Sequence, residues 1–220
     1  MAARYWRDVL GATGPLLIEP KPQEPSKHQY DWDVAATAGF LREFGLHEKF
    51  RLNVECNHAT LAGHSCAHET ETAVAMGMLG GLDANTGDPQ VGWDTDQFNN
   101  DHQEMTMVLK HILLNGGFKN GGFNFDAKLR RQSVDIDDLF IGHIGGIDIL
   151  ARALINAIKM IEENFIENFK HNRYKKWSQD EASKILAGEI TLEEISKNIS
   201  EPEIKSGKQE LLEKYLNNCS

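Results

Sequence analysis

Short apolar segments alternate with helical segments along most of the chain, and this alternation is the feature that most constrains the fold. Apolar and alternating patterns predict strands over residues 16–19, 51–55, 82–84 and 123–126. Helical periodicity covers residues 33–44, 67–78, 103–114 and 138–169, and the last could divide into two helices around residues 142–146. Strands that alternate with helices form parallel sheets, because each helix carries the chain back to the starting edge. We therefore predict an α/β fold with a parallel sheet of about four strands.

An acidic residue stands at the end of each predicted strand. These residues are Glu19, Glu55, Asp83 and Asp126. The carboxyl ends of parallel strands meet at one edge of a sheet or one mouth of a barrel, so the four carboxylates should converge. Any one of them alone is more often a solvated charge or a helix cap. Together they would repel one another and raise each other's pKa, and a divalent cation would resolve that repulsion.

A second set of candidate ligands surrounds Glu55. His58 follows three residues later, and Asp94 and Asp96 lie in a long loop rich in Gly, Asp, Pro and Asn that runs to about residue 101. Loops of this length are uncommon without a functional use. Residues two apart in an extended chain point the same way, so both aspartates could join Glu55 and His58 around a second cation.

The composition argues against several classes of protein. A net charge of −10 disfavours a nucleic-acid partner. No apolar run approaches the roughly 18 residues that a membrane span needs, and residues 1–10 lack the apolar region of a secretory signal. Three cysteines, Cys56, Cys66 and Cys219, are an odd number without zinc-type spacing, which indicates reduced thiols rather than a disulfide framework. We therefore predict a cytoplasmic protein with no nucleic-acid or membrane partner.

The chain changes character beyond residue 172. Short amphipathic helical segments are predicted over residues 178–186, 192–199 and 207–216, with many charges and few large apolar groups. Short helices with so little apolar surface are marginal alone, so we predict an arm over residues 173–220 that lies on a partner subunit. A mobile tail is the alternative. Residues 1–172 would then form the metal-binding domain.

Several of these segments resemble the xylose isomerase family in its longer-chain class. The motifs are LLIEPKP, NVECNHATLAGH, LDANTGDPQVGWDTDQF, FNFDAK and DLFIGHIGGID, and SGKQELLEKYL resembles the family's C-terminal segment. The resemblance runs from about residue 14 to the end of the chain. It implies two divalent cations, Mg, Mn or Co, in two sites that share one ligand. The implied structural site is Glu19, Glu55, Asp83 and Asp126, and the implied catalytic site is Glu55, His58, Asp94 and Asp96.

The resemblance also implies an activity, the isomerisation of an aldose to a ketose by metal-assisted hydride shift. The substrate would be D-xylose, with D-glucose as a further candidate. Lys21 matches the lysine that polarises the sugar's carbonyl oxygen, and Glu55 and Asp96 would be the other catalytic residues. A cis peptide bond is implied at Glu24-Pro25, and Cys56 stands where the family commonly has alanine.

The chain is short for the fold that the resemblance implies. A complete (β/α)8 barrel takes about 250 residues, whereas the segments here resemble only the second half of the family's barrel. The histidine and aspartate that open the sugar ring belong to the first half. A half barrel exposes strand edges, so we predict closure by oligomerisation, most simply as a homodimer. The alternative is a non-catalytic metal-binding half-barrel subunit that needs a separate N-terminal half.

His64 and His68 are the histidines whose spacing most resembles a metal-binding pair. They lie four residues apart on a predicted helix, which places both imidazoles on one face. A solvent-facing or capping role is the favoured interpretation of this pair, and metal binding is the alternative.

Overall fold

The structure, a computed structural model, describes residues 5–197 and 206–219. The chain divides into two compact units, one ending at Ile158 and the other formed by Lys159–Cys219. Each is described by itself. Within the described residues, no helix is both long and apolar enough to cross a membrane.

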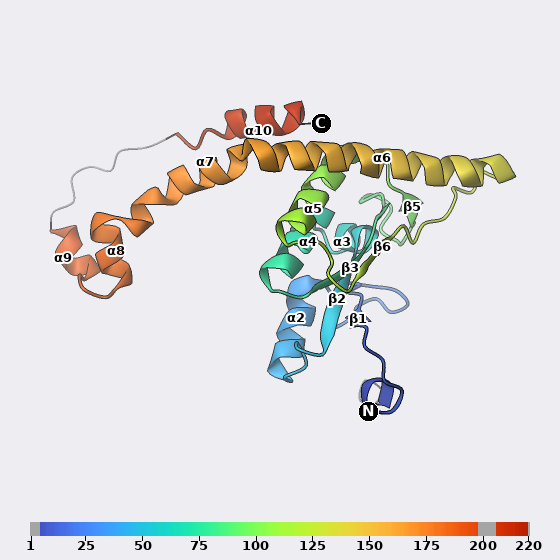
Figure 1. Cartoon of the computed structure of the whole chain (residues 1–220), viewed down its shortest axis with the longest axis horizontal. Helices are drawn as coiled ribbons and strands as arrows, with labels where there is room; N and C mark the ends of the chain where they lie inside the picture. The colour runs from blue at the N-terminus through green and yellow to red at the C-terminus, as the bar shows by residue number, and fades with distance from the viewer. Residues whose placement is uncertain (1–4, 198–205, 220) are drawn as a thin grey trace. The chain divides into compact units, whose positions relative to one another are not determined.

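A four-stranded parallel sheet forms the centre of the first unit in the described chain, in the order β1-β2-β3-β6 (Figure 1). The strands are β1 (Leu16–Ile18), β2 (Phe50–Glu55), β3 (Leu79–Asp83) and β6 (Gly122–Asn124). This result confirms the predicted parallel α/β sheet and is consistent with part of a (β/α)8 barrel. β1 and β6 are the edge strands, and closure of the sheet is not seen in this single chain.

Three capped helices cover the sheet and bury its apolar residues. They are α2 (Val34–Glu43), α4 (Cys66–Ala75) and α5 (His102–Leu114). The side chains of Asp33, Ser65 and Asp101 accept hydrogen bonds from the first backbone N–H groups of these helices, as N-cap residues do. The core between helices and sheet consists of fully buried apolar side chains, among them Val34, Leu41, Leu52, Val54, Leu82, Met105 and Val108. This packing fixes the strand ends on which the acidic residues stand.

Two features of this unit were not predicted. Helix α3 (Cys56–Leu61) begins immediately after β2, and a two-stranded antiparallel ribbon joins β4 (Asn85–Thr86) to β5 (Gln97–Phe98). The ribbon closes the long loop, because its two strands flank residues 87–96. It therefore returns the loop's aspartates toward the end of β3.

Helix α6 (Ile136–Glu163) is continuous, so the alternative of two pieces around residues 142–146 is wrong. The glycines there permit close packing. A Cβ atom at Gly146 would lie 2.9 Å from the ring of Phe125, and one at Gly142 would lie 3.1 Å from the ring of Phe98. The helix ends instead at Asn164, whose φ of 51° lies in the left-handed region.

The second unit continues with short helices. They are α7 (Phe165–Tyr174), the 3-10 turn η2 (Lys175–Ser178), α8 (Asp180–Leu186), α9 (Leu192–Ser196) and α10 (Gln209–Asn218). Tyr215 of α10 stacks on Phe165, and its hydroxyl donates a 2.9 Å hydrogen bond to Glu163. The predicted helical segments are thus present, although residues 198–199 of the predicted segment 192–199 lie outside the described residues.

The prediction of reduced thiols is wrong for two cysteines. Cys56 and Cys66 form a disulfide, and Cys219 is free and buried. The cause is the turn between α3 and α4, which brings the two Cα atoms to 4.6 Å although the residues are ten positions apart. The cysteines therefore no longer support the predicted cytoplasmic location. The expected cis peptide bond at Glu24-Pro25 is present.

Candidate metal centre

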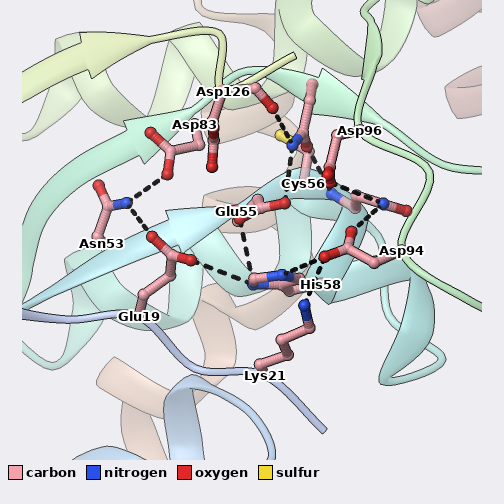
Figure 2. A network of polar contacts seen from close by, with 12 residues as sticks. Glu19, Lys21, Asn53, Glu55, Cys56, His58, Asp83, Asp94, Asp96 and Asp126 are labelled. Atoms are coloured by element: carbon pink, nitrogen blue, oxygen red, sulfur yellow. Dashed lines mark hydrogen bonds and ion pairs between the residues drawn. The ribbon is translucent and has the colours of Figure 1, made fainter. Parts of the chain in front are cut away.

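The strand register brings the first set of predicted ligands together. Glu55 pairs with Asp83, and Asp83 pairs with Asn124 two residues before Asp126. Glu19 directly follows β1. Each of the four acidic residues offers one carboxylate oxygen, and these oxygens lie within 4.8 Å of one another (Figure 2). Glu55 and Asp83 are buried on the central strands, whereas Glu19 and Asp126 are exposed on the edges.

Asparagine amides donate hydrogen bonds to these carboxylates. The Asn53 Nδ2 group donates to Glu19 at 2.8 Å and to Asp83 at 2.6 Å (Figure 2). The Asn124 amide also donates to Asp83. Asn53 has room for this because it faces Gly81 on β3, where a Cβ atom would lie 2.4 Å from the Asn53 Oδ1 atom. The amide donors partly compensate the negative charge.

Asn85 connects the strand ends to the following helix. Its Nδ2 group donates to Glu55 at 2.7 Å and to the Asp126 carbonyl at 3.0 Å, while its Oδ1 atom accepts the Asn57 backbone N–H at 2.9 Å. Asn85 is fully buried, so all of these bonds are shielded from water. The residue thereby fixes Glu55 relative to α3, which carries His58.

The second predicted set also converges. Glu55, Asp94 and Asp96 present oxygens within 4.8 Å of one another. His58 lies beside them, with Nδ1 3.3 Å from Glu55 and 3.6 Å from Glu19, and Nε2 3.3 Å from Asp94. His58 Nδ1 is buried and makes no hydrogen bond within the described part of the chain. Its lone pair or proton therefore faces two carboxylates directly.

Two lysines neutralise the outer aspartates. Lys21 lies 2.5 Å from Asp94, and Lys128 lies 2.8 Å from Asp96. Partial burial opposes the charge of Lys21, but the hydrogen bond to Asp94 and nearby carboxylates raise the pKa of its ammonium group. Burial also opposes ionisation of Asp94, yet hydrogen bonds with His58, Asp96 and Lys21 hold the pKa of Asp94 well below its usual range. The hydrogen bond to Asp96 likewise raises the pKa of Lys128, so both lysines stay charged next to the cluster.

The inner carboxylates behave in the opposite way. Burial, together with the neighbouring Glu19 and Asp94, raises the pKa of Glu55 to about 10 despite the hydrogen bond from Asn85. Burial and Glu19 likewise raise the pKa of Asp83 to about 6. Without a cation, Glu55 therefore retains a proton at neutral pH.

The chemistry of this donor set fits divalent cations. Buried carboxylates that must otherwise hold a proton, and a buried imidazole nitrogen without a hydrogen bond, are the groups that a cation satisfies. Oxygen-rich ligands suit Mg²⁺ or Mn²⁺, and one added imidazole also suits Mn²⁺ or Co²⁺. Glu55 belongs to both groups of candidate ligands, so it is the residue that they share.

Sequence reasoning missed the residues that hold the ligands. They are Asn53, Asn57, Asn85, Asn124 and Lys128. Asn53 offered a signal, because it stands two residues before Glu55 and so shares its face of the strand. Lys128 stands two residues after Asp126 in the FNFDAK segment, but nothing in the sequence pairs it with Asp96.

The fold and the cluster define an α/β protein whose strand ends gather carboxylates suited to divalent cations. Residues 170–220 match a family model described as the XylA2 C-terminal domain. Xylose isomerase from Arabidopsis thaliana is 54% identical over 215 residues, which are 96% of this chain and 45% of that protein. Xylose isomerase from Photorhabdus laumondii is 53% identical over 212 residues, 94% of this chain and 48% of that protein. The chain is thus similar to these xylose isomerases over almost its whole length, and it spans slightly less than half the length of these curated relatives.

Proposed function

We propose that this chain supplies the metal centre for the isomerisation of D-xylose to D-xylulose, with D-glucose as a second substrate. The observation that carries the proposal is the convergence of two ligand groups on Glu55 with Lys21 beside them. The names of the relatives, at 52–54% identity, support the same reaction.

Each ligand group has a proposed role. Glu19, Glu55, Asp83 and Asp126 would hold one cation, and Glu55, His58, Asp94 and Asp96 would hold another, as Mg, Mn or Co. Bound cations would supply Lewis-acid polarisation of the sugar's oxygen atoms. His58 is buried, so it would hold its position as a ligand without competition from water. Glu55 would have to release its proton before it could serve both groups.

Lys21 and Asp96 would act on the substrate side of the centre. The Lys21 ammonium group, charged and partly exposed, would donate to the negative charge that develops on the carbonyl oxygen during hydride transfer. To do so it would exchange its hydrogen bond with Asp94 for one with the sugar. Asp96, held by Lys128, would keep its carboxylate directed at the same space.

Completion of the barrel is also a proposal. β1 and β6 are edge strands in the described chain, and unpaired strand edges favour association. A second copy of the chain is the simplest partner, and residues 173–220 would form an arm on it. The match of residues 170–220 to a separate C-terminal domain supports this division of the chain at 172/173.

A non-catalytic metal-binding half barrel is the second candidate, favoured by the four-stranded sheet of the described chain, in which β1 and β6 are edge strands. In that case a separate N-terminal half would supply the groups that open the sugar ring.

Ketose formation from D-xylose, measured with EDTA and then with added Mg²⁺, Mn²⁺ or Co²⁺, tests the proposal. We expect metal-dependent turnover that Lys21→Met and Asp96→Asn each reduce at least a hundredfold, whereas the exposed control Lys27→Met leaves it unchanged. Stoichiometric metal binding without turnover would favour the second candidate. Turnover that survives both substitutions would refute the assigned roles.

A further inference from the structure

A separate cluster of nitrogen and oxygen ligands lies at the start of α4. His64 precedes the helix, and His68 and Glu69 stand in its first turn. One ligand atom from each of the three residues lies within 4.8 Å of the others. His64 Nδ1 is 2.7 Å from Glu69 Oε1, and His68 Nε2 is 3.9 Å from the same oxygen. None of the three belongs to the ligand groups around Glu55.

Backbone hydrogen bonds at the start of α2 orient the carboxylates of this cluster. Glu69 Oε2 accepts the Val34 N–H at 2.7 Å, which leaves Oε1 directed at His64. Asp33 caps the same helix in a similar way: its Oδ1 atom accepts the Ala36 N–H at 2.7 Å, and Oδ2 lies 4.0 Å from His64. Ligands that are already oriented by other bonds lose little entropy when a metal binds.

The cluster is buried on its carboxylate side and open on its imidazole side. The Glu69 side chain is 4% exposed, whereas the side chains of His64 and His68 are 31% and 58% exposed. A buried carboxylate attracts a cation more strongly than an exposed one, because less water screens it. The Cys56–Cys66 disulfide restrains the turn that carries His64. An ion can therefore reach a prearranged carboxylate from the solvent side, where the two imidazoles are exposed.

We propose that His64, His68 and Glu69 form a second type of metal site, selective for Zn²⁺, with Asp33 or water as the fourth ligand. Two imidazoles and one carboxylate are a zinc-type ligand set, unlike the oxygen-rich groups around Glu55. Bonds of about 2.0–2.1 Å place tetrahedral ligands about 3.4 Å apart. The 3.9 Å separation of His68 from Glu69 must then shorten by roughly 0.5 Å, and the 2.7 Å separation of His64 from Glu69 must lengthen by roughly 0.7 Å as the metal replaces the hydrogen bond; rotations of the two imidazole side chains achieve both changes.

The opposing interpretation is that His64 and Glu69 form only a hydrogen bond that stabilises the start of α2. In that interpretation His68 contributes only a ring contact with His64, at 4.7 Å between centroids, and a 3.9 Å approach to Glu69. His68 is therefore the residue to change. Because its side chain is mostly exposed, His68→Gln should leave the fold intact, which circular dichroism would verify.

The test is calorimetric titration of the EDTA-treated chain with Zn²⁺ in excess Mg²⁺, which competes for the oxygen-rich groups. We expect a zinc-binding event that His68→Gln and His64→Gln each weaken at least tenfold. The matched control His47→Gln, a partly exposed histidine paired with Glu48, should bind zinc as the unmodified chain does. X-ray absorption at the zinc edge should find two imidazoles, whereas the Glu55 groups offer one, that of His58.

The variant Asp96→Asn separates this site from the proposed isomerase centre, because it removes a ligand of that centre alone. Zinc binding that persists in Asp96→Asn supports the new site whether or not the chain proves to be an isomerase. Three results would overturn the proposal. Zinc binding could be lost in Asp96→Asn, it could be equally tight in His68→Gln and the unmodified chain, or the unmodified chain could bind no zinc in excess Mg²⁺.

Discussion

Cation binding should expel a proton from Glu55. Burial and the neighbouring carboxylates raise the pKa of Glu55 to about 10 in the metal-free chain, against 4.5 for an ordinary glutamate. At pH 7.5 only about 0.3% of Glu55 would then be ionised. A cation that binds Glu55 must therefore displace roughly one proton per centre, at a cost of roughly 3 kcal/mol at this pH. Asp83, with a pKa of about 6, should add up to about half a proton near pH 6.

Isothermal titration with Mn²⁺ in buffers of different ionisation enthalpy measures the number of protons released. We expect about one proton at pH 7.5 and an apparent Kd that falls about tenfold for each pH unit between pH 7 and 9. Glu55→Gln cannot release this proton and should bind Mn²⁺ at least a hundredfold more weakly. Glu43→Gln, on the exposed end of α2, is the matched control and should behave as the unmodified chain does. A release near zero at pH 7.5, with a pH-independent Kd, would refute the reasoning.

Three further predictions concern stability. The pKa of Glu55 is higher in the folded chain than in the unfolded chain, so the stability that Glu55 contributes without metal is complete below about pH 4.5 and is lost as pH rises toward 10. In thermal melts of the EDTA-treated chain, the unfolding midpoint should therefore fall more over this pH range than it does in Glu55→Gln. Asn53→Asp replaces the amide between Glu19 and Asp83 with a third carboxylate, so urea unfolding without metal should show a loss of about 2–3 kcal/mol, and an unchanged midpoint would contradict the role given to Asn53. The double substitution Cys56→Ala/Cys66→Ala removes a cross-link across ten residues and should lower the free energy of unfolding by about 2–3 kcal/mol in oxidising buffer. In reducing buffer the two chains should be equally stable, and a difference that persists there would mean that the loss comes from side-chain packing.

The sequence predicted the sheet and the convergence of ligands because both follow from simple periodicities. Glu55 and Asp83 end strands whose apolar residues are distinct, and parallel register then aligns them. The helix α3 was missed because it begins at the residue after β2, with no glycine or proline between them, so its residues were predicted to form a turn. The ribbon of β4 and β5 was missed because each strand has only two residues, too few for a pattern.

Other parts of the site depend on contacts that no local pattern reports. Asn85 acts through bonds to Glu55, Asp126 and Asn57, which are 28 to 41 residues away along the chain. The disulfide likewise depends on a turn that brings Cys56 to Cys66, and their spacing alone matches no known framework. The glycines of α6 predicted a break because glycine weakens helices, whereas here their missing side chains admit Phe98 and Phe125.

The exposure of the candidate ligands follows the position of their strands, and this would couple the centre to the proposed assembly. Glu55 and Asp83 lie on inner strands and are already shielded, whereas Glu19 and Asp126 follow the edge strands β1 and β6 and face water. A chain that pairs with either edge would remove water from one of these carboxylates and strengthen its attraction for a cation. By reciprocity, a bound cation would strengthen that pairing by the same factor. The cation concentration would then set how much of the protein is assembled.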